Sequence, residues 1–290
     1  NGAWYWIENG RVATGWRVIN GKWYYLNPAD GRMLTGFYKD ATGQLFYSDG
    51  SGAMLSTTGW YQLNGTWYWV NGNGSLATGW INVGGTWYYM GENGAMKTGW
   101  YQVKGVWYYS NGSGAMQTGW LNRGGTWYYL TGSGAMATGW INLGGTWYYL
   151  NPSNGDMVGA GWHLINNKWY YFDGSGAMYS NRWIGNYYVG GNGEMLTNTW
   201  VGSYWVGADG KWIPNYDPDV NANWVKSGNT WYYQRPDGSK LTNSWKRING
   251  SWYYFGADGA MTTGWKYVDG YKFYFGTVSY THLTLPTIYS

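Results

Sequence analysis

The amino-acid sequence predicts an all-β fold, an elongated solenoid of stacked β-hairpins. A tryptophan recurs every 20 residues from Trp60 to Trp140, and a dipeptide suited to a tight turn follows each one at a fixed distance. Aromatic residues make up 22% of the chain and glycine supplies 50 of its 290 residues, which argues against a conventional apolar core. A unit this short cannot bury a core alone, so neighbouring units must stack.

Each repeat is predicted to form one hairpin, because residue pairs that tolerate positive φ stand four and five residues after the leading tryptophan. These pairs are Asn20-Gly21, Asn64-Gly65, Gly84-Gly85, Lys104-Gly105, Gly124-Gly125, Gly144-Gly145, Asn249-Gly250 and Asp269-Gly270. Closing the turn at Gly84-Gly85 pairs Trp80 with Tyr89. Two hairpins with shorter arms keep this aromatic pairing: turns at Gly185-Asn186 and Gly202-Ser203 pair Trp183 with Tyr188 and Trp200 with Trp205.

The two faces of each hairpin differ, since side chains alternate along a strand. One face is predicted to hold Trp80, Asn82, Trp87 and Tyr89, and the other Ile81, Val83, Thr86 and Tyr88. The middle residue of each Trp-Tyr-Tyr triplet is therefore expected inside, with the aliphatic side chains. Connectors such as "NGSGAM" end in a methionine, at Met96, Met116 and Met136, which we expect to fill the gap between stacked hairpins or to wall a site.

The repeat weakens at "NYDPDVNANW", where Pro214 and Pro218 interrupt it and the Trp200 to Trp224 spacing lengthens to 24 residues. We therefore expect a main hairpin-repeat array over 1–214 and a second, short block over 215–276. The last residues, 277–290, read "TVSYTHLTLPTIYS" and do not continue the repeat. We expect this tail to be foreign or disordered.

Several function classes are disfavoured by what the chain lacks. Its charged fraction is 11% and its net charge of +4 is not clustered, so nucleic acid is not an expected partner. No apolar run approaches the ~18 residues of a membrane span, and a secretion signal would lie outside the sequence given. From Trp60 to Leu150 the ionisable acid and base side chains are Glu92, Lys97, Lys104 and Arg123, which do not provide the facing carboxylates of a glycosidase.

Metal and triad chemistry are disfavoured for similar reasons. The histidines, His163 and His282, are far apart in sequence, and the chain contains no cysteine. Asp217, Asp219 and Asn221 alternate as in a calcium loop, but Ala222 stands at the position that needs glycine and Gly228 at the position of the closing glutamate. We expect no catalytic residue, metal site or cofactor.

The repeat "TGWxxxxGxWYYLxxxGAM", at Trp100 to Met116 and Trp120 to Met136, resembles the choline-binding (cell-wall-binding) repeat of Gram-positive surface proteins. The likeness spans about Trp4 to Phe275 and is most specific from Trp60 to Phe172. It implies a left-handed solenoid with about three hairpins per turn, secreted and attached to the bacterial cell wall or surface. It also implies that choline groups of teichoic acid lie between consecutive hairpins, held by two tryptophans of one hairpin and a tyrosine of the next. Such modules are usually appended to a wall hydrolase or adhesin.

Five ligand-binding sites follow from the resemblance, with the tyrosine chosen by the predicted face. They are Trp60, Trp67 and Tyr89; Trp80, Trp87 and Tyr109; Trp100, Trp107 and Tyr129; Trp120, Trp127 and Tyr149; and Trp140, Trp147 and Tyr171. Phe37 and Leu45 replace both tryptophans of the second repeat, and no second tryptophan stands seven residues after Trp183 or Trp200, so we assign no site there.

Elementary chemistry supports this interpretation but leaves alternatives. A trimethylammonium group has no hydrogen-bond donor and gains from ring faces, at about 0.5 to 2 kcal/mol per contact. Repeated sites would raise avidity for one polymer. Similar glycine- and tyrosine-rich repeats occur in glucan-binding domains, and Asn82, Asn122 and Asn142 lie on the tryptophan face where a sugar would need amides. The remaining alternative is a structural spacer whose rings only pack.

Overall fold

A computed structural model describes residues 2–276, in which every regular element is a β-strand and no helix occurs. This part of the chain therefore contains no helix suited to crossing a membrane. Contacts divide the chain into two units, one reaching to Ile184 and including Val189–Met195, the other formed by Gly185–Tyr188 and the residues from Leu196 onward. The predicted tail 277–290 lies outside the described residues. The predicted block boundary after residue 214 stays a proposal.

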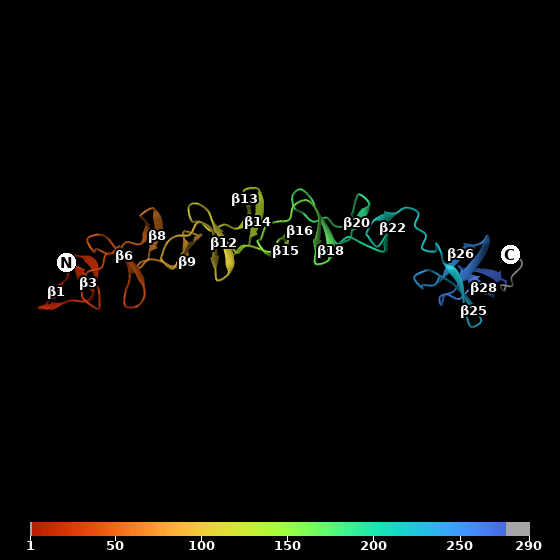
Figure 1. Ribbon diagram of the computed structural model, residues 1–290, viewed down its shortest axis with the longest axis horizontal. Helices are drawn as coiled ribbons and strands as arrows, with labels where there is room; N and C mark the ends of the chain where they lie inside the picture. Colours follow the sequence, from red (N-terminus) through yellow and green to blue (C-terminus); the bar gives the residue numbers. More distant parts are fainter. Residues whose placement is uncertain (1, 277–290) are drawn as a thin grey trace. The chain divides into compact units, whose positions relative to one another are not determined.

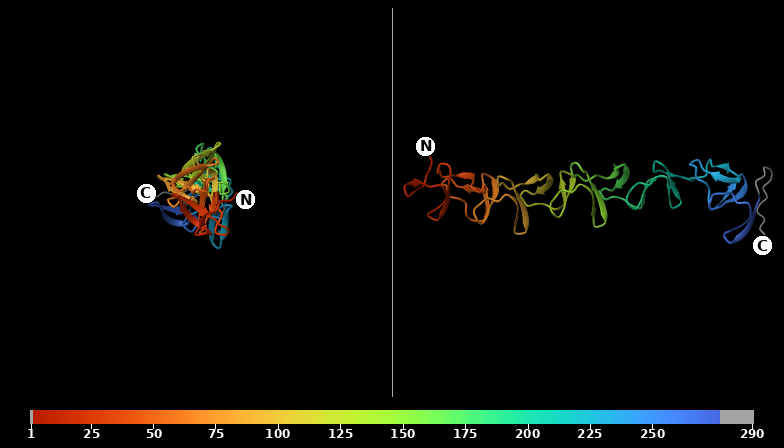
Figure 2. Two further views of the ribbon diagram at one scale, coloured as in Figure 1. Left: turned by 90° about the vertical axis from the view of Figure 1, so that its left-hand side faces the viewer. Right: turned by 90° about the horizontal axis from the view of Figure 1, so that it is seen from below.

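The first unit is a row of two-stranded antiparallel hairpins (Figure 1). Its strands are β1 (Ile7–Glu8), β2 (Arg11–Val12), β3 (Gly15–Ile19), β4 (Lys22–Leu26), β5 (Gly36–Lys39), β6 (Leu45–Ser48), β7 (Gly59–Leu63), β8 (Thr66–Val70), β9 (Gly79–Val83), β10 (Thr86–Met90), β11 (Gly99–Val103), β12 (Val106–Ser110), β13 (Gly119–Arg123), β14 (Thr126–Leu130), β15 (Gly139–Leu143), β16 (Thr146–Leu150), β17 (Gly161–Ile165) and β18 (Lys168–Phe172). Within this unit the hairpins follow one another in sequence order (Figure 2).

The short strands β19 (Arg182–Ile184) and β20 (Tyr187–Val189) come next in the chain. The second unit then holds β21 (Thr199–Val201), β22 (Tyr204–Val206), β23 (Trp212–Ile213), β24 (Asn223–Ser227), β25 (Thr230–Gln234), β26 (Ser244–Ile248), β27 (Ser251–Phe255), β28 (Gly264–Val268) and β29 (Tyr271–Phe275). In this unit β21, β22 and β23 form a three-stranded sheet, and the other strands pair as hairpins.

The turn chemistry predicted from the sequence is confirmed. Gly84 and Gly85 have φ angles of 59° and 86°, the positive pair that a two-residue type I′ turn requires. The register places Trp80 opposite Tyr89, and in the shortened hairpin Trp200 lies opposite Trp205. Because the turn has two residues, the parity of every side chain in the hairpin follows from it.

Stacking between hairpins uses the connectors. The connector that follows the β11–β12 hairpin bonds back to the β9–β10 hairpin: the backbone N–H of Met116 donates to the carbonyl of Trp87 at 2.8 Å, and the same bond recurs from Met136 to Trp107. The Met96 side chain packs against the next connector so closely that a Cβ on Gly114 would lie 2.2 Å from its sulfur. The prediction that these methionines fill the gap between hairpins is confirmed.

The core lies where the second strand of each hairpin ends. Val70, Met90, Leu130, Leu150 and Phe172 occupy this position and are fully buried. The expected interior of middle tyrosines with aliphatic side chains is therefore only partly right: the residues on that face, such as Tyr88, Ile81 and Val83, are half-buried. The physical reason is that each hairpin face is covered by one neighbouring hairpin and stays partly open to solvent. The residues at the end of the second strand are fully buried because the connectors also cover them.

Two buried hydroxyl pairs lie within this array. The Tyr38 hydroxyl is 3.0 Å from the Ser48 hydroxyl, and burial raises the pKa of Tyr38 to about 12. Tyr101 and Ser110 repeat this arrangement at 3.0 Å, and burial also raises the pKa of Tyr101. Each hydroxyl satisfies its partner, as buried polar groups require.

Candidate functional site

Four of the five hairpins that begin at Trp60, Trp80, Trp100, Trp120 and Trp140 present a corner made of two tryptophan rings; Trp80 and Trp87 are the exception. The first tryptophan lies on the first strand and the second, seven residues later, on the strand that pairs with it. Trp100 and Trp107 have ring centroids 6.3 Å apart and planes at 88°. The same corner occurs at Trp60 with Trp67 (6.5 Å, 88°), Trp120 with Trp127 (6.2 Å, 90°) and Trp140 with Trp147 (6.4 Å, 82°). The second ring is about 40% exposed in each case, so one wall of the corner is open to solvent.

The next hairpin supplies a third ring to this corner, and it is the middle tyrosine. The leading tryptophan contacts that ring edge-on in five successive interfaces: Trp60 with Tyr88 (4.8 Å), Trp80 with Tyr108 (4.9 Å), Trp100 with Tyr128 (5.0 Å), Trp120 with Tyr148 (5.0 Å) and Trp140 with Tyr170 (4.8 Å). We call each such set, two tryptophans of one hairpin and the tyrosine or phenylalanine ring that the next hairpin brings against them, a cage.

The third aromatic of the triplet, which the sequence assigns to the site, is not the ring that the next hairpin brings against the leading tryptophan, and its role in binding stays a prediction. Tyr89, Tyr109, Tyr129, Tyr149 and Tyr171 each pack on the leading tryptophan of their own hairpin, at 5.0, 5.2, 5.2, 4.9 and 5.3 Å. Hairpins stacked in one sense put the tryptophan face of one against the opposite face of the next. The incoming ring therefore has to come from the face that carries the middle tyrosine.

The asparagines on the tryptophan face are engaged in their own turns. The side-chain oxygen of Asn82 accepts the backbone N–H of Gly85 at 3.0 Å. Asn122 and Asn142 make the same bond to Gly125 and Gly145, at 3.1 and 3.0 Å. These amide oxygens are therefore occupied in closing the hairpin, which weakens the argument that they serve sugar hydroxyl groups.

Two further cages escaped the sequence analysis. Trp16 and Trp23 form a corner (6.1 Å, 82°) closed by Phe46 at 4.7 Å from Trp16. In the second unit, Trp224 and Trp231 (6.3 Å, 87°) are closed by Tyr253 at 4.9 Å. Their signal was present, since both pairs have the same seven-residue spacing as Trp100 and Trp107.

The irregular repeats differ from the cages. In the second repeat Phe37 contacts Tyr68 at 5.0 Å, but Leu45 stands where the second tryptophan would complete the corner. In the shortened hairpin Trp205 is stacked on Tyr216, with centroids 4.4 Å apart and planes at 8°. A stacked pair leaves no space between its rings, so no cage is assigned there.

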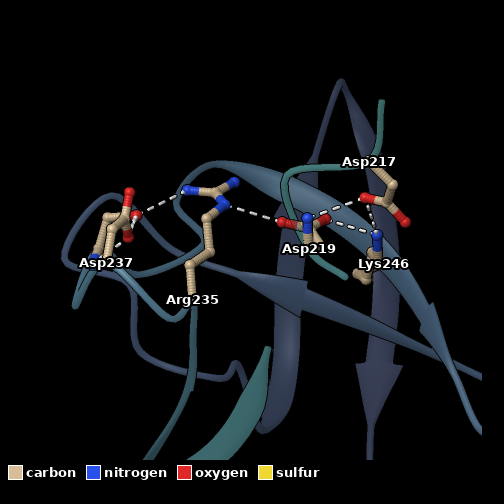
Figure 3. Close-up of polar contacts among 6 residues, drawn as sticks. Asp217, Asp219, Arg235, Asp237 and Lys246 are labelled. Atoms are coloured by element: carbon tan, nitrogen blue, oxygen red, sulfur yellow. Dashed lines mark hydrogen bonds and ion pairs between the residues drawn. The ribbon is translucent and has the colours of Figure 1, made fainter. Parts of the chain in front are cut away.

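The calcium-like pattern of the second unit is used for ion pairs (Figure 3). Asp219 accepts a hydrogen bond from the Arg235 guanidinium at 2.8 Å and another from the Lys246 ammonium group. Its side chain is 10% exposed, and Lys246 also reaches Asp217 at 3.5 Å. The described residues contain no group of three side chains suited to a metal ion. Two cations therefore already neutralise the carboxylate that a calcium ion would need.

Sequence-family models match most of the chain. A choline-binding repeat model matches 13–58, 97–138, 118–162, 137–183 and 241–279, and a second one matches 177–212. A model described as a putative cell wall binding repeat matches 58–76, 78–96 and 223–240. No curated protein sequence matches the chain.

Solved structures from Streptococcus pneumoniae have the same fold. CbpJ from strain TIGR4 is 30% identical with a TM-score of 0.63, and the match covers 90% of this chain and 98% of that chain. Choline binding protein F, solved in the presence of a peptidoglycan analogue, is 27% identical with a TM-score of 0.57 over 89% of this chain and 95% of that chain. The same protein has been solved in complex with ipratropium, at 26% identity, a TM-score of 0.56 and coverage of 89% and 96%. With one repeat model matching more than half of its residues, the chain belongs to the choline-binding repeat family.

Proposed function

We propose that this chain is a non-catalytic anchoring module that binds choline groups of cell-wall teichoic acids in the cages between successive hairpins. The observation that carries the proposal is the repeated corner of two perpendicular indoles closed by a tyrosine of the next hairpin, as at Trp100, Trp107 and Tyr128. Membership of the choline-binding repeat family supports it.

The cage chemistry suits a quaternary ammonium group. Its positive charge is spread over methyl groups that cannot donate a hydrogen bond, so aromatic faces stabilise it where a carboxylate is not needed. At about 0.5 to 2 kcal/mol per ring, three rings give up to ~6 kcal/mol, which corresponds to binding in the millimolar range once association costs are included. Several weak sites on one chain would then hold a choline-bearing polymer by avidity.

A cell-wall polymer is the partner class, and the cell surface the location, that the relatives support. One family model is described as a cell wall binding repeat, and choline binding protein F was solved with a peptidoglycan analogue. Ipratropium, found in another structure of that protein, carries a quaternary ammonium group as choline does. Teichoic acid as the particular polymer, and secretion as the route to the wall, are part of our proposal.

Tryptophan fluorescence tests the ligand class. The protein is titrated with choline chloride, with sodium chloride at equal ionic strength and with a glucan oligosaccharide. We expect a saturable, choline-specific change in the millimolar range that is reduced in Trp120→Ala and retained in Asn122→Ala, whose amide closes only its own turn. A response to the oligosaccharide alone would favour a glucan-binding module, and a response to neither ligand would favour a structural spacer.

The non-catalytic part of the proposal has a separate test. From Trp60 to Leu150 the chain offers one carboxylate, Glu92, too few for a paired-carboxylate hydrolase in that block. Incubating the purified chain with labelled cell walls should release no soluble fragments. Release that scales with protein concentration would show an activity that the proposal denies.

A further inference from the structure

The cage of Trp16 and Trp23 opens into a pocket unlike the others. Its volume is about 430 Å³, in the range of small-molecule sites. Beside these two rings it is lined by Phe46, Met54, Gly72 and four polar side chains, of which Asp40 is the one that carries a charge; the others are Gln44, Ser56 and Asn73. A carboxylate therefore stands at the wall of an aromatic cage.

The position that Asp40 occupies holds no acidic residue in the four cages that follow. Asp40 directly follows the first strand of the incoming hairpin, β5, and its backbone N–H donates to the Gln44 carbonyl at 3.0 Å across a turn one residue longer than usual. The residues that stand last before the turn in the next four hairpins to close a cage are Val83, Val103, Arg123 and Leu143. At this position the face that turns toward the cage carries an anion, an aliphatic group or a cation, depending on the repeat.

The Asp40 side chain is held in place before any ligand arrives. One carboxylate oxygen accepts the backbone N–H groups of Thr42 and Gln44, at 2.9 and 3.0 Å, and the Thr42 hydroxyl at 2.6 Å. The loop itself is anchored by the Ala41 N–H, which donates to the Tyr25 hydroxyl at 2.8 Å. Such fixed geometry avoids the ordering cost that a free surface carboxylate would incur on binding.

The charge state of Asp40 follows from these contacts. Burial opposes ionisation, but the hydrogen bonds from Thr42 and Gln44, together with one from the Trp16 side chain, lower its pKa below the usual value. The carboxylate is therefore ionised at neutral pH. Asp40 and Trp16 line the same pocket, so the negative charge stands at the wall of the cage.

The cage of Trp100 shows the opposite electrostatics. Arg123, at the position equivalent to Asp40, holds its guanidinium carbon 5.2 Å from the centre of the Tyr109 ring, and Tyr109 packs on Trp100 at 5.2 Å. A fixed cation near a cation-binding cage weakens it by like-charge repulsion, whereas Asp40 strengthens its own cage by attraction.

We propose that the Trp16, Trp23 and Phe46 pocket is a second class of site, selective for ammonium groups that carry N–H donors, with Asp40 as the hydrogen-bond acceptor. A primary ammonium can place its carbon chain against the rings and donate to the carboxylate, and such charge-assisted bonds are stronger than neutral ones. Trimethylammonium has no donor and gains only the general attraction. The inference rests on the proposed function, because it takes the ring corner to be a cation site.

Methionine methyl groups can report each cage separately. Met54 lines the pocket, and its backbone N–H donates to the carbonyl of Trp23. Met157 makes the same bond to the carbonyl of Trp127, which belongs to a cage that has no acidic residue at the position of Asp40. The full chain labelled with ¹³C-methyl methionine is titrated with ethanolamine hydrochloride, choline chloride and sodium chloride. Parallel titrations with Nα-acetyl-lysine and glucosamine identify whether an amino alcohol, a peptide amine or an amino sugar fits best.

We expect an ethanolamine midpoint at Met54 about tenfold lower than at Met157, since a hydrogen bond to a charged group contributes on this scale. Asp40→Asn, which keeps the oxygen that caps the loop, should raise the Met54 midpoint about tenfold toward the Met157 value. The inference is overturned if none of the three amines distinguishes Met54 from Met157 in the wild-type protein, or if Asp40→Asn leaves the Met54 midpoint unchanged. The choline arm is independent: no choline response at Met157 would count against the proposed function, whatever Met54 does.

Discussion

Two adjacent tyrosines, Tyr148 and Tyr149, are assigned to different cages. Replacing each of them with leucine distinguishes the contribution that each one makes to choline binding. Tyr148 lies 5.0 Å from Trp120 and closes the cage of the preceding hairpin. Tyr149 lies 4.9 Å from Trp140 and supports a wall of the following cage. Leucine keeps an apolar side chain at each position but removes the ring face. Tyr148→Leu should therefore weaken the cage of Trp120, and Tyr149→Leu that of Trp140.

The size of the effect follows from one lost ring. A cation–ring contact contributes about 0.5 to 2 kcal/mol, which corresponds to a loss of about 2- to 30-fold in affinity at the affected cage. Each variant also loses one aromatic pair, at a cost of about 0.5 to 1.5 kcal/mol in stability. Because both tyrosines are half-buried, this stability cost is similar for the two variants and each controls for the other.

Choline titrations followed by the methyl signals of Met157 and Met178 provide the assay, since their backbone N–H groups bond to Trp127 and Trp147 of the two cages. Tyr148→Leu should raise the choline midpoint at Met157 and leave Met178 close to wild type. Tyr149→Leu should do the reverse. If Tyr149→Leu instead raised the Met157 midpoint while Tyr148→Leu did not, the third aromatic of the triplet would be the cage residue and the face assignment would be refuted.

Three further outcomes are expected. Gly134→Ala should melt at a lower temperature than Gly125→Ala: both have φ above 80°, costing about 1 to 2 kcal/mol, but only at Gly134 would the new Cβ meet the Met116 sulfur, at 2.3 Å. Equal melting temperatures would contradict the tight connector packing. The Lys168 hydrogen bond lowers the pKa of Glu194, and the Glu194 hydrogen bond raises the pKa of Lys168, so the pair stabilises the fold between these two values and the stabilisation is lost as pH falls through the lowered pKa of Glu194. The urea midpoints of wild type and Glu194→Gln should then differ at pH 7, and the difference should shrink as the pH falls below the ordinary glutamate pKa of 4.5; a gap that keeps its size in acid would assign the difference to another cause. Choline at 100 times its dissociation constant should stabilise the fold by about 2.7 kcal/mol per occupied site, visible as a rise in melting temperature against sodium chloride; no rise would argue that the cages do not bind it.

Much of the fold could be predicted because it is locally encoded. A pair such as Gly84 and Gly85 determines a two-residue turn, and the turn determines that Trp80 faces Tyr89. The regular spacing of tryptophans gives the repeat length, and a repeat this short must stack. These inferences depend on residues within one hairpin, so a single sequence is enough for them.

The candidate site was predicted in part, for the same reason. The corner of Trp100 and Trp107 lies within one hairpin and was identified correctly as a pair on one face. The third ring comes from the next hairpin, and the choice between Tyr128 and Tyr129 depends on which face that hairpin turns toward Trp100. Strand alternation within a hairpin does not contain this information.

Tertiary structure alone decided the contacts between distant segments. It showed that Asp40 lines the cage of Trp16, and that Asp219 is neutralised by Arg235 and Lys246. A charged side chain in the sequence is compatible with an exposed position, an ion pair or a ligand site, because its energy depends on neighbours that only stacking brings together. The sequence by itself determined the hairpins and their periodicity through local turn and strand preferences, whereas the identity of each cage depended on the packing of one hairpin against the next.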